Sequence, residues 1–258
     1  MVVTGFGLIN LCAFIPKRFY KSSNTKISKS VTEGSENVHI SDGLILNNTS
    51  IILAIAMWII SVGILAWSWK KAQKTYSRSI TALLAISSAF VFAAQMINFP
   101  IAFGTSGHLI GGTFLAVLLG PYAAILSMTL VLSMQAIFFA DGGIVAFGMN
   151  LFNMAIIGGL SFFLIKLLTK KNKSQKWFIS SVFIASWTSV MLGALITSFE
   201  VAPAFSGGIA VTLPSMMLLH GIIGIGEGAI TTVLVTSIQR LNPTIMGGLS
   251  LLKERKML

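Results

Sequence analysis

The chain has 258 residues, of which 55% are hydrophobic and only 10% are charged, and its mean hydropathy is +0.87. This composition is typical of a membrane protein and excludes an ordinary soluble domain. The net charge of +11 is compatible with nucleic-acid binding, but the positions of the basic residues, described below, argue against it. Because Cys12 is the only cysteine, an internal disulfide is excluded, and no cluster of Cys and His predicts a zinc site.

Residues 1–37 do not have the pattern of a secretory signal peptide. Their apolar run, 6–15, precedes the basic cluster instead of following it, and no small-residue cleavage site lies before Val38. The remainder is rich in Ser, Lys and Glu, which is typical of disorder. We therefore expect 1–37 to be a mis-assigned or disordered extension, and 38–258 to form one transmembrane domain.

Seven apolar stretches follow, and each predicts a helix of an all-α membrane protein, because about 20 apolar residues span a bilayer. They are 50–69, 80–100, 107–119, 122–139, 143–168, 177–199 and 213–238. The third stretch is too short to span a bilayer alone and ends at Gly120-Pro121. We therefore expect neighbouring helices to shelter it.

Basic residues predict the orientation of these helices, because cytoplasmic loops carry most of the Lys and Arg. Thirteen of them follow the first span, surround the loop after the fifth, and follow the seventh: Lys70, Lys71, Lys74, Arg78, Lys166, Lys170, Lys171, Lys173, Lys176, Arg240, Lys253, Arg255 and Lys256. Seven spans with the amino end outside place all thirteen inside, whereas six spans would place the second group outside. The sequence thus predicts an outside amino end, a cytoplasmic carboxyl end and no nucleic-acid partner.

The stretch Val38-His39-Ile40-Ser41-Asp42-Gly43 has the donors of a metal clamp, provided that residue 38 carries a free α-amine. That amine, the amide nitrogen of His39 and the imidazole of His39 can close two fused chelate rings around one small cation. Square-planar nitrogen donors suit Ni(II) and Cu(II) and, with additional ligands, Co(II).

The segment from His39 to Gly43 resembles the amino terminus of the CbiM/NikM family, in which Met-His-Ile is followed by an acidic residue and Gly. The resemblance extends to the last predicted span, and departs from the family in residues 1–37 and in Val38, where the family has Met. Further matching motifs are Asn98-Phe99-Pro100, Gly104-Thr105-Ser106-Gly107-His108, Gly120-Pro121, Asp141-Gly142-Gly143, Asn150 with Asn153, and the segment from His220 through Glu227.

Members of this family are substrate-capture subunits of energy-coupling-factor transporters for cobalt and nickel. The resemblance implies that Val38 (as an N-terminal Met amine), His39 and His108 ligate the metal, which is a transported substrate and not a resident cofactor. It implies a membrane coupling subunit, two ATPase subunits and a small accessory membrane subunit as partners, in the cell membrane. The absence of a Gly-x-x-x-x-Gly-Lys-Ser/Thr run in the sequence agrees with ATP hydrolysis by another chain.

His220 and Glu227 lie seven residues apart, on one face of the last predicted span. Ionisable side chains inside a bilayer need partners. The expected partners are Asn98, Gln135, Asn150 and Asn153. Three interpretations stay open at this point: a structural polar network, a set of residues that orients His39 or His108, and direct metal ligation by His220.

Two acidic residues near the predicted outer face are expected to have structural roles. We expect Asp42 to tie down the amino-terminal segment through local backbone hydrogen bonds, and Asp141 to shape the Asp-Gly-Gly turn. The stripe of Ala85, Ala89 and Ala93 predicts close helix packing, either inside this bundle or against the coupling subunit.

Alternative functions are an intramembrane serine protease of the rhomboid type, a vitamin-capture subunit, and a capture subunit specific for Ni(II). The protease interpretation rests on Gly104-Thr105-Ser106-Gly107 with His220 as a base, and leaves the segment 38–43 unexplained. No catalytic residue is expected. We favour Co(II), with a role in cobalamin synthesis, because the segments around His108 and Asp141 resemble chains grouped with cobalt uptake.

Overall fold

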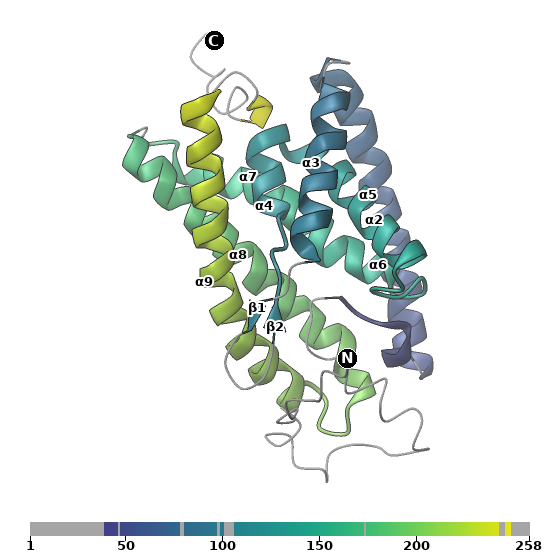
Figure 1. Ribbon diagram of the computed structural model, residues 1–258. Helices are drawn as coiled ribbons and strands as arrows, with labels where there is room; N and C mark the ends of the chain where they lie inside the picture. The colour runs from purple at the N-terminus through teal and green to yellow at the C-terminus, as the bar shows by residue number, and fades with distance from the viewer. Residues whose placement is uncertain are drawn as a thin grey trace, which may run out of the picture.

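The computed structural model describes residues 39–45, 47–77, 80–96, 99–100, 106–172, 174–242 and 246–248, and these are helical apart from short connections and a two-residue β ladder (Figure 1). Expectations for residues 1–37, Val38 and Asn98 lie outside these ranges. The elements are η3 (Asp42–Leu44), α2 (Asn48–Thr75), α3 (Ile80–Gln95), β1 (Phe99–Pro100), β2 (Ser106–Gly107), α4 (Gly112–Leu119), α5 (Pro121–Phe138), α6 (Phe147–Asn150), η5 (Leu151–Ile156), α7 (Ile157–Leu168), α8 (Gln175–Val201), η6 (Ala202–Ala204) and α9 (Ile209–Leu241).

Five helical segments are long and apolar enough to cross a membrane, within the part of the chain that the structure describes. They are Asn48–Thr75, Pro121–Phe138, Phe147–Leu168, Gln175–Ala204 and Ile209–Leu241. The other two predicted spans are shorter than expected: α3 has 16 residues and α4 has 8. The all-α class is therefore confirmed, and the third predicted stretch is too short to span a membrane, as expected. The correction concerns the second stretch, 80–100, whose helix has only 16 residues.

The connection between α3 and α4 explains this correction. Phe99 pairs with Gly107 and Pro100 with Ser106 in an antiparallel ladder, so the chain is extended where the sequence predicted helix. Pro100 disfavours helical geometry at the residue before it, which ends the helical pattern early. Helix α4 then begins only after Gly111, whose φ of 78° is a left-handed conformation that favours glycine.

Helix α4 is the centre of the bundle, and the expectation that its neighbours shelter it is confirmed. All eight of its residues are buried, and it lies among α3, α5, α7, α8 and α9 (Figure 1). Gly120, with φ of 88°, ends α4, and Pro121 occupies the first position of α5, where its missing N–H has no helical partner to lose.

Close packing of α4 against α7 depends on two glycines that face each other. A Cβ added at Gly112 would lie 2.7 Å from the Cα of Gly158, which is backbone and cannot rotate away. We therefore expect Gly112→Ala to lower the free energy of unfolding by about 1–3 kcal/mol through overpacking. Thermal unfolding of the purified variant in detergent measures this, with Gly221→Ala as the control, because a Cβ there meets nothing within 4 Å. Equal stability of the two variants would contradict the close-packing argument.

The carboxyl-terminal ends of α2, α7 and α9 lie at one end of the molecule, uppermost in Figure 1. Each carries a basic residue in its last turn: Lys74, Lys166 and Arg240. The segment η3 and the connection between α8 and α9 lie toward the opposite end. Among the described residues, these three basic last turns, which are far apart in the sequence, thus lie at one end of the bundle.

Candidate metal-capture site

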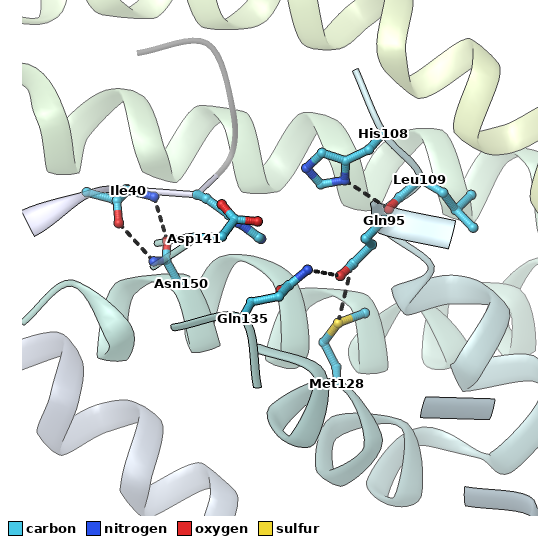
Figure 2. Close-up of polar contacts among 9 residues, drawn as sticks. Ile40, Gln95, His108, Leu109, Met128, Gln135, Asp141 and Asn150 are labelled. Atoms are coloured by element: carbon cyan, nitrogen blue, oxygen red, sulfur yellow. Dashed lines mark hydrogen bonds and ion pairs between the residues drawn. The ribbon is translucent and has the colours of Figure 1, made fainter. Parts of the chain in front are cut away.

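The first described residues are hydrogen-bonded to α6 and to the segment that precedes it. Asn150 accepts from the backbone N–H of Ile40 at 2.7 Å and donates to the Ile40 carbonyl at 3.0 Å, and the same carbonyl accepts from Gly143 N–H at 3.1 Å (Figure 2). A side-chain amide can pair with both backbone groups of one residue because it carries a donor and an acceptor. This pairing sets the position of residue 40 and therefore of its neighbour His39.

Asp42 fastens the same segment, but not through the local hydrogen bonds that we expected. Its carboxylate accepts from the N–H of Ile144 at 3.0 Å and from the N–H of Ala146 at 2.9 Å, more than 100 residues downstream. A Cβ at Gly143 would collide with this carboxylate, so glycine is required there. The expectation of a local role was wrong because the two partners meet only in the folded chain.

His39 is buried and held by Asp141. Its Nδ1 lies 3.0 Å from Asp141 Oδ1, and because a carboxylate only accepts, Nδ1 is the donor. The hydrogen bond from His39 lowers the pKa of Asp141, so the carboxylate stays charged. The chain bends directly after Asp141, at Gly142 with φ of 78°, but the contact of Asp141 with His39 was not predicted from the sequence.

His108 is the second buried imidazole of the site. Its ring centroid lies 5.5 Å from that of His39, and its Nδ1 donates to the Leu109 carbonyl at 3.0 Å. Burial, and then the nearby His39, lowers the pKa of His108 to about 4. The ring is therefore neutral at physiological pH, and its second nitrogen, which points toward the side of Asp141 in Figure 2, carries a free lone pair.

Glu227 holds the segment that carries His108. Its two carboxylate oxygens accept from the N–H groups of Ile110 at 2.7 Å and Gly111 at 2.9 Å. On the other side of this segment, Gln95 Nε2 donates to the Ile110 carbonyl at 2.7 Å, and Gln135 Nε2 donates to Gln95 Oε1 at 2.7 Å. His108, the candidate ligand, thus precedes a segment whose backbone N–H and carbonyl groups are hydrogen-bonded to side chains of α3 and α9.

Of the partners predicted for His220 and Glu227, Gln135, Asn150 and Asn153 bond other residues, and Asn98 lies outside the described residues. Glu227 bonds backbone N–H groups, and His220 Nδ1 donates to the Met216 carbonyl at 2.9 Å within α9. Asn153 instead donates to Thr197 Oγ1 at 3.0 Å and to Glu200 at 2.5 Å. Glu227 bonds backbone groups because the N–H groups of Ile110 and Gly111, just before α4, have no partner within a helix.

Two functional candidates were missed or misjudged at the sequence level, Gln95 and Asp141. A usable signal existed for Asp141, since the chain has only seven acidic residues and a carboxylate among apolar segments needs a partner. For Gln95 no sequence signal pointed to the carbonyl of Ile110.

The donors brought together are two imidazoles and main-chain groups. Within the described ranges, no three side chains of His, Cys, Asp or Glu come together as a metal site. A metal bound by His39 and His108 therefore needs additional donors, such as backbone nitrogen, to complete its coordination. Imidazole ligands suit Co, Ni, Cu and Zn.

Comparisons with known proteins agree with this arrangement. The family profile described as "CbiM: Cobalt uptake substrate-specific transmembrane region" matches residues 39–245. A protein of Archaeoglobus fulgidus, described as "Putative fused nickel transport protein NikMN", is 36% identical over 212 residues, which is 81% of this chain and 68% of that protein. The cobalt transport protein CbiM of Thermosipho melanesiensis is 33% identical over 168 residues, 62% of this chain and 69% of its own.

A solved structure has the same fold. The crystal structure of a truncated transition metal transporter superimposes with a TM-score of 0.68 at 35% identity, covering 78% of this chain and 98% of the other. These relatives are metal transporters, which removes the support for a protease or a vitamin-capture subunit. Together with the apolar helices, they make this chain a multi-pass membrane protein of cobalt or nickel transport.

Proposed function

Because the chain belongs to the CbiM family of cobalt-uptake transmembrane proteins, we propose that it is the substrate-capture subunit of an ATP-driven importer for Co(II) or Ni(II). The observation that carries this proposal is the pair of buried imidazoles, His39 and His108, with ring centroids 5.5 Å apart. One imidazole of this pair is held by a carboxylate, and the lowered pKa of the other leaves His108 neutral, so that its ring can bind a transition metal without first losing a proton.

The proposed donors are the α-amine of residue 38, the amide and imidazole nitrogens of His39, and the imidazole of His108. Fused chelate rings use Nδ1 of His39, because Nε2 lies on the far side of the ring from the main chain. In the described ring position Nδ1 contacts Asp141. Closing the clamp therefore requires the ring to turn about Cβ–Cγ. The carboxylate, whose side chain is 37% exposed, is then free to follow and accept from Nε2–H.

Asp141 should matter for metal affinity although it need not touch the metal. We expect Asp141→Ala to weaken Co(II) and Ni(II) binding by about 10–100-fold, because the imidazole loses the carboxylate that orients it. Asp141→Asn should recover part of the loss, since its amide oxygen still accepts from the ring. Metal titration of the purified variants checks both values. Full affinity in Asp141→Ala would show that this contact does not position His39.

The clamp needs a free amine at residue 38, and we propose that residues 1–37 are absent from the working protein. Val is the residue that an internal GTG codon encodes, whereas GTG used as a start codon inserts Met. Glu33-Gly34 corresponds to GAR-GGN in the coding sequence, a pattern that resembles a ribosome-binding site. Translation from codon 38 would give Met-His-Ile-Ser-Asp-Gly. Intact-mass measurement on protein from the native host tests this, and a chain that retains residues 1–37 and binds metal tightly would overturn both the start site and the clamp.

Inserting one Ala between residues 38 and 39 of the short form should remove metal binding. The insertion adds a residue to the chelate and changes its ring sizes, whereas the bonds of Ile40 to Gly143 and Asn150, and of Asp42 to Ala146, remain available. Metal titration measures the loss of binding, and thermal unfolding of the same sample shows whether the fold is retained.

The proposed orientation has the amino end outside and the carboxyl end in the cytoplasm. It is supported by the basic last turns of α2, α7 and α9, which lie at one end of the bundle, because cytoplasmic ends carry the excess of Lys and Arg (Figure 1). The segment that begins at His39 leads into α2 at its opposite end. The site thus takes its metal from outside.

Transport needs partners, and α3 offers a surface for one of them. Ala85, Ala89 and Ala93 are exposed, while Ser87, Val91 and Gln95 on the other side of α3 are buried. The alternative of packing inside this bundle is therefore not supported. We propose that the stripe receives the membrane coupling subunit, with two ATPase subunits and a small accessory membrane subunit completing the importer.

Two measurements test the function. Purified protein should bind Co(II) or Ni(II), and cells should take up the metal strongly only when coupling and ATPase subunits are expressed with this chain. Equal uptake without them would count against a capture subunit. We favour Co(II) for cobalamin synthesis, and neighbouring genes for cobalamin synthesis, as opposed to urease or hydrogenase genes, would support that choice.

A further inference from the structure

Gln135, in the last turn of α5, is hydrogen-bonded in two directions. Its backbone carbonyl accepts from the N–H of Asp141 at 3.1 Å. Its side-chain Nε2 donates to Gln95 Oε1 at 2.7 Å, and Gln95 Nε2 in turn donates to the Ile110 carbonyl at 2.7 Å. Figure 2 shows Gln135 between Asp141 and Gln95. One path of hydrogen bonds thus runs from Asp141 through Gln135 and Gln95 to Ile110.

The two ends of this path lie next to the two candidate metal ligands. Asp141 Oδ1 lies 3.0 Å from His39 Nδ1, and Ile110 follows His108 by two residues. The two imidazoles come from segments that are far apart in the sequence, yet their ring centroids lie 5.5 Å apart. The path therefore joins the half of the site that carries His39 to the half that carries His108.

Other polar side chains at the site hold one half each. Asn150 bonds the backbone of Ile40, beside the first imidazole, and Glu227 bonds the backbone of Ile110 and Gly111, after the second. These contacts fix each half to its own neighbours. The bond between the two glutamine side chains links the halves to each other.

Stability does not account for a glutamine at position 135. The side chain is 1% exposed, and its Oε1 has no hydrogen-bond partner among the residues that the structure describes. A buried acceptor without a partner is unfavourable. A leucine there would remove this acceptor and would leave Gln95 Oε1 without its donor instead, so the number of unpaired acceptors would stay the same. An unpaired group that is kept in a buried place points to a role in function.

We propose that Gln135 is a positioning residue for metal capture, which keeps the imidazoles of His39 and His108 in register through Gln95. This inference rests on the proposed function. With the bridge in place, both rings are arranged before the metal arrives. Without it, each half keeps its own contacts, but binding has to order the pair first, and the cost of this ordering lowers the affinity.

The first test compares metal affinity and thermal unfolding of Gln135→Leu with those of the wild type. We expect affinity for Co(II) and Ni(II) to fall about tenfold, and the unfolding temperature to stay within about 2 °C of the wild type. A merely structural role would give the reverse. Unchanged affinity together with a lower unfolding temperature would overturn the inference.

Ser127→Ala is the matched control for this substitution. Ser127 is buried on α5, eight residues before Gln135, and its Oγ lies 2.7 Å from Ser88 Oγ, so this pair also links α5 to α3. Its loss should lower the unfolding temperature and leave metal affinity unchanged. If Ser127→Ala weakened metal binding as much as Gln135→Leu, any contact between α3 and α5 would serve, and the inference would be wrong.

Two further measurements test whether the glutamines act as one bridge. The double variant Gln95→Leu/Gln135→Leu should bind metal no more weakly than Gln95→Leu, because both changes break the same path, whereas additive losses would contradict it. The absorption bands of bound Co(II), which depend on its coordination geometry, should change in Gln135→Leu and not in Ser127→Ala. A wild type that binds neither metal would overturn the proposed function together with this inference. Tight binding by the wild type that Gln135→Leu leaves unchanged would overturn this inference alone.

Discussion

His108→Ala should abolish binding of Co(II) and Ni(II), with a loss of affinity of more than about 100-fold. The substitution removes a neutral, buried imidazole whose lone pair faces the site and whose ring centroid lies 5.5 Å from that of His39. The fold should survive, because the segment after His108 is held through Ile110 and Gly111, whose backbone groups the variant keeps.

Metal titration of the purified variant measures the loss, and thermal unfolding checks that the protein is intact. Thr113→Val is a matched control, since Thr113 is buried five residues later and bonds Ser189 of α8. His39→Ala should give the same loss. Full affinity in His108→Ala would disprove the assignment of the site.

Glu227→Ala should both destabilise the protein and weaken metal binding. The variant leaves the N–H groups of Ile110 and Gly111 buried without an acceptor, which costs about 1–3 kcal/mol for each group, or about 2–6 kcal/mol together. The segment that positions His108 would then relax, so metal affinity should fall as well. Glu227→Gln keeps one acceptor oxygen and should lose about half as much stability.

Glu200→Ala separates the two effects of the Glu227 substitution. Glu200 is another buried carboxylate, bonded to Asn153 and to no residue of the segment 108–111 among those described. Its loss should lower the unfolding temperature and leave metal affinity near that of the wild type. If Glu227→Ala kept wild-type affinity for Co(II) and Ni(II), Glu227 would have no part in positioning His108.

The agreement between sequence and structure is best in the long helices. Helices α2, α8 and α9 cover the predicted spans 50–69, 177–199 and 213–238 and extend beyond them, because a long apolar run in a bilayer has no alternative to helix. The prediction failed at 80–100 and 107–119, where Pro100 and the glycines around His108 turn apolar residues into extended chain. Hydropathy measures how apolar these residues are, but it does not show where the helical backbone ends.

The sequence by itself determined the membrane class, the all-α fold and the two histidines that the structure brings together, because apolar length and local motifs are readable without long-range contacts. The tertiary structure alone decided that Asp141 contacts His39, that Asn150 and Asp42 clip the first described segment to the chain after α5, and that Glu227 holds the backbone after His108. Each of these contacts joins residues about 100 positions apart. Their partners are mostly backbone N–H and carbonyl groups, which every residue carries, so only the packing of the helices selects which of them meet.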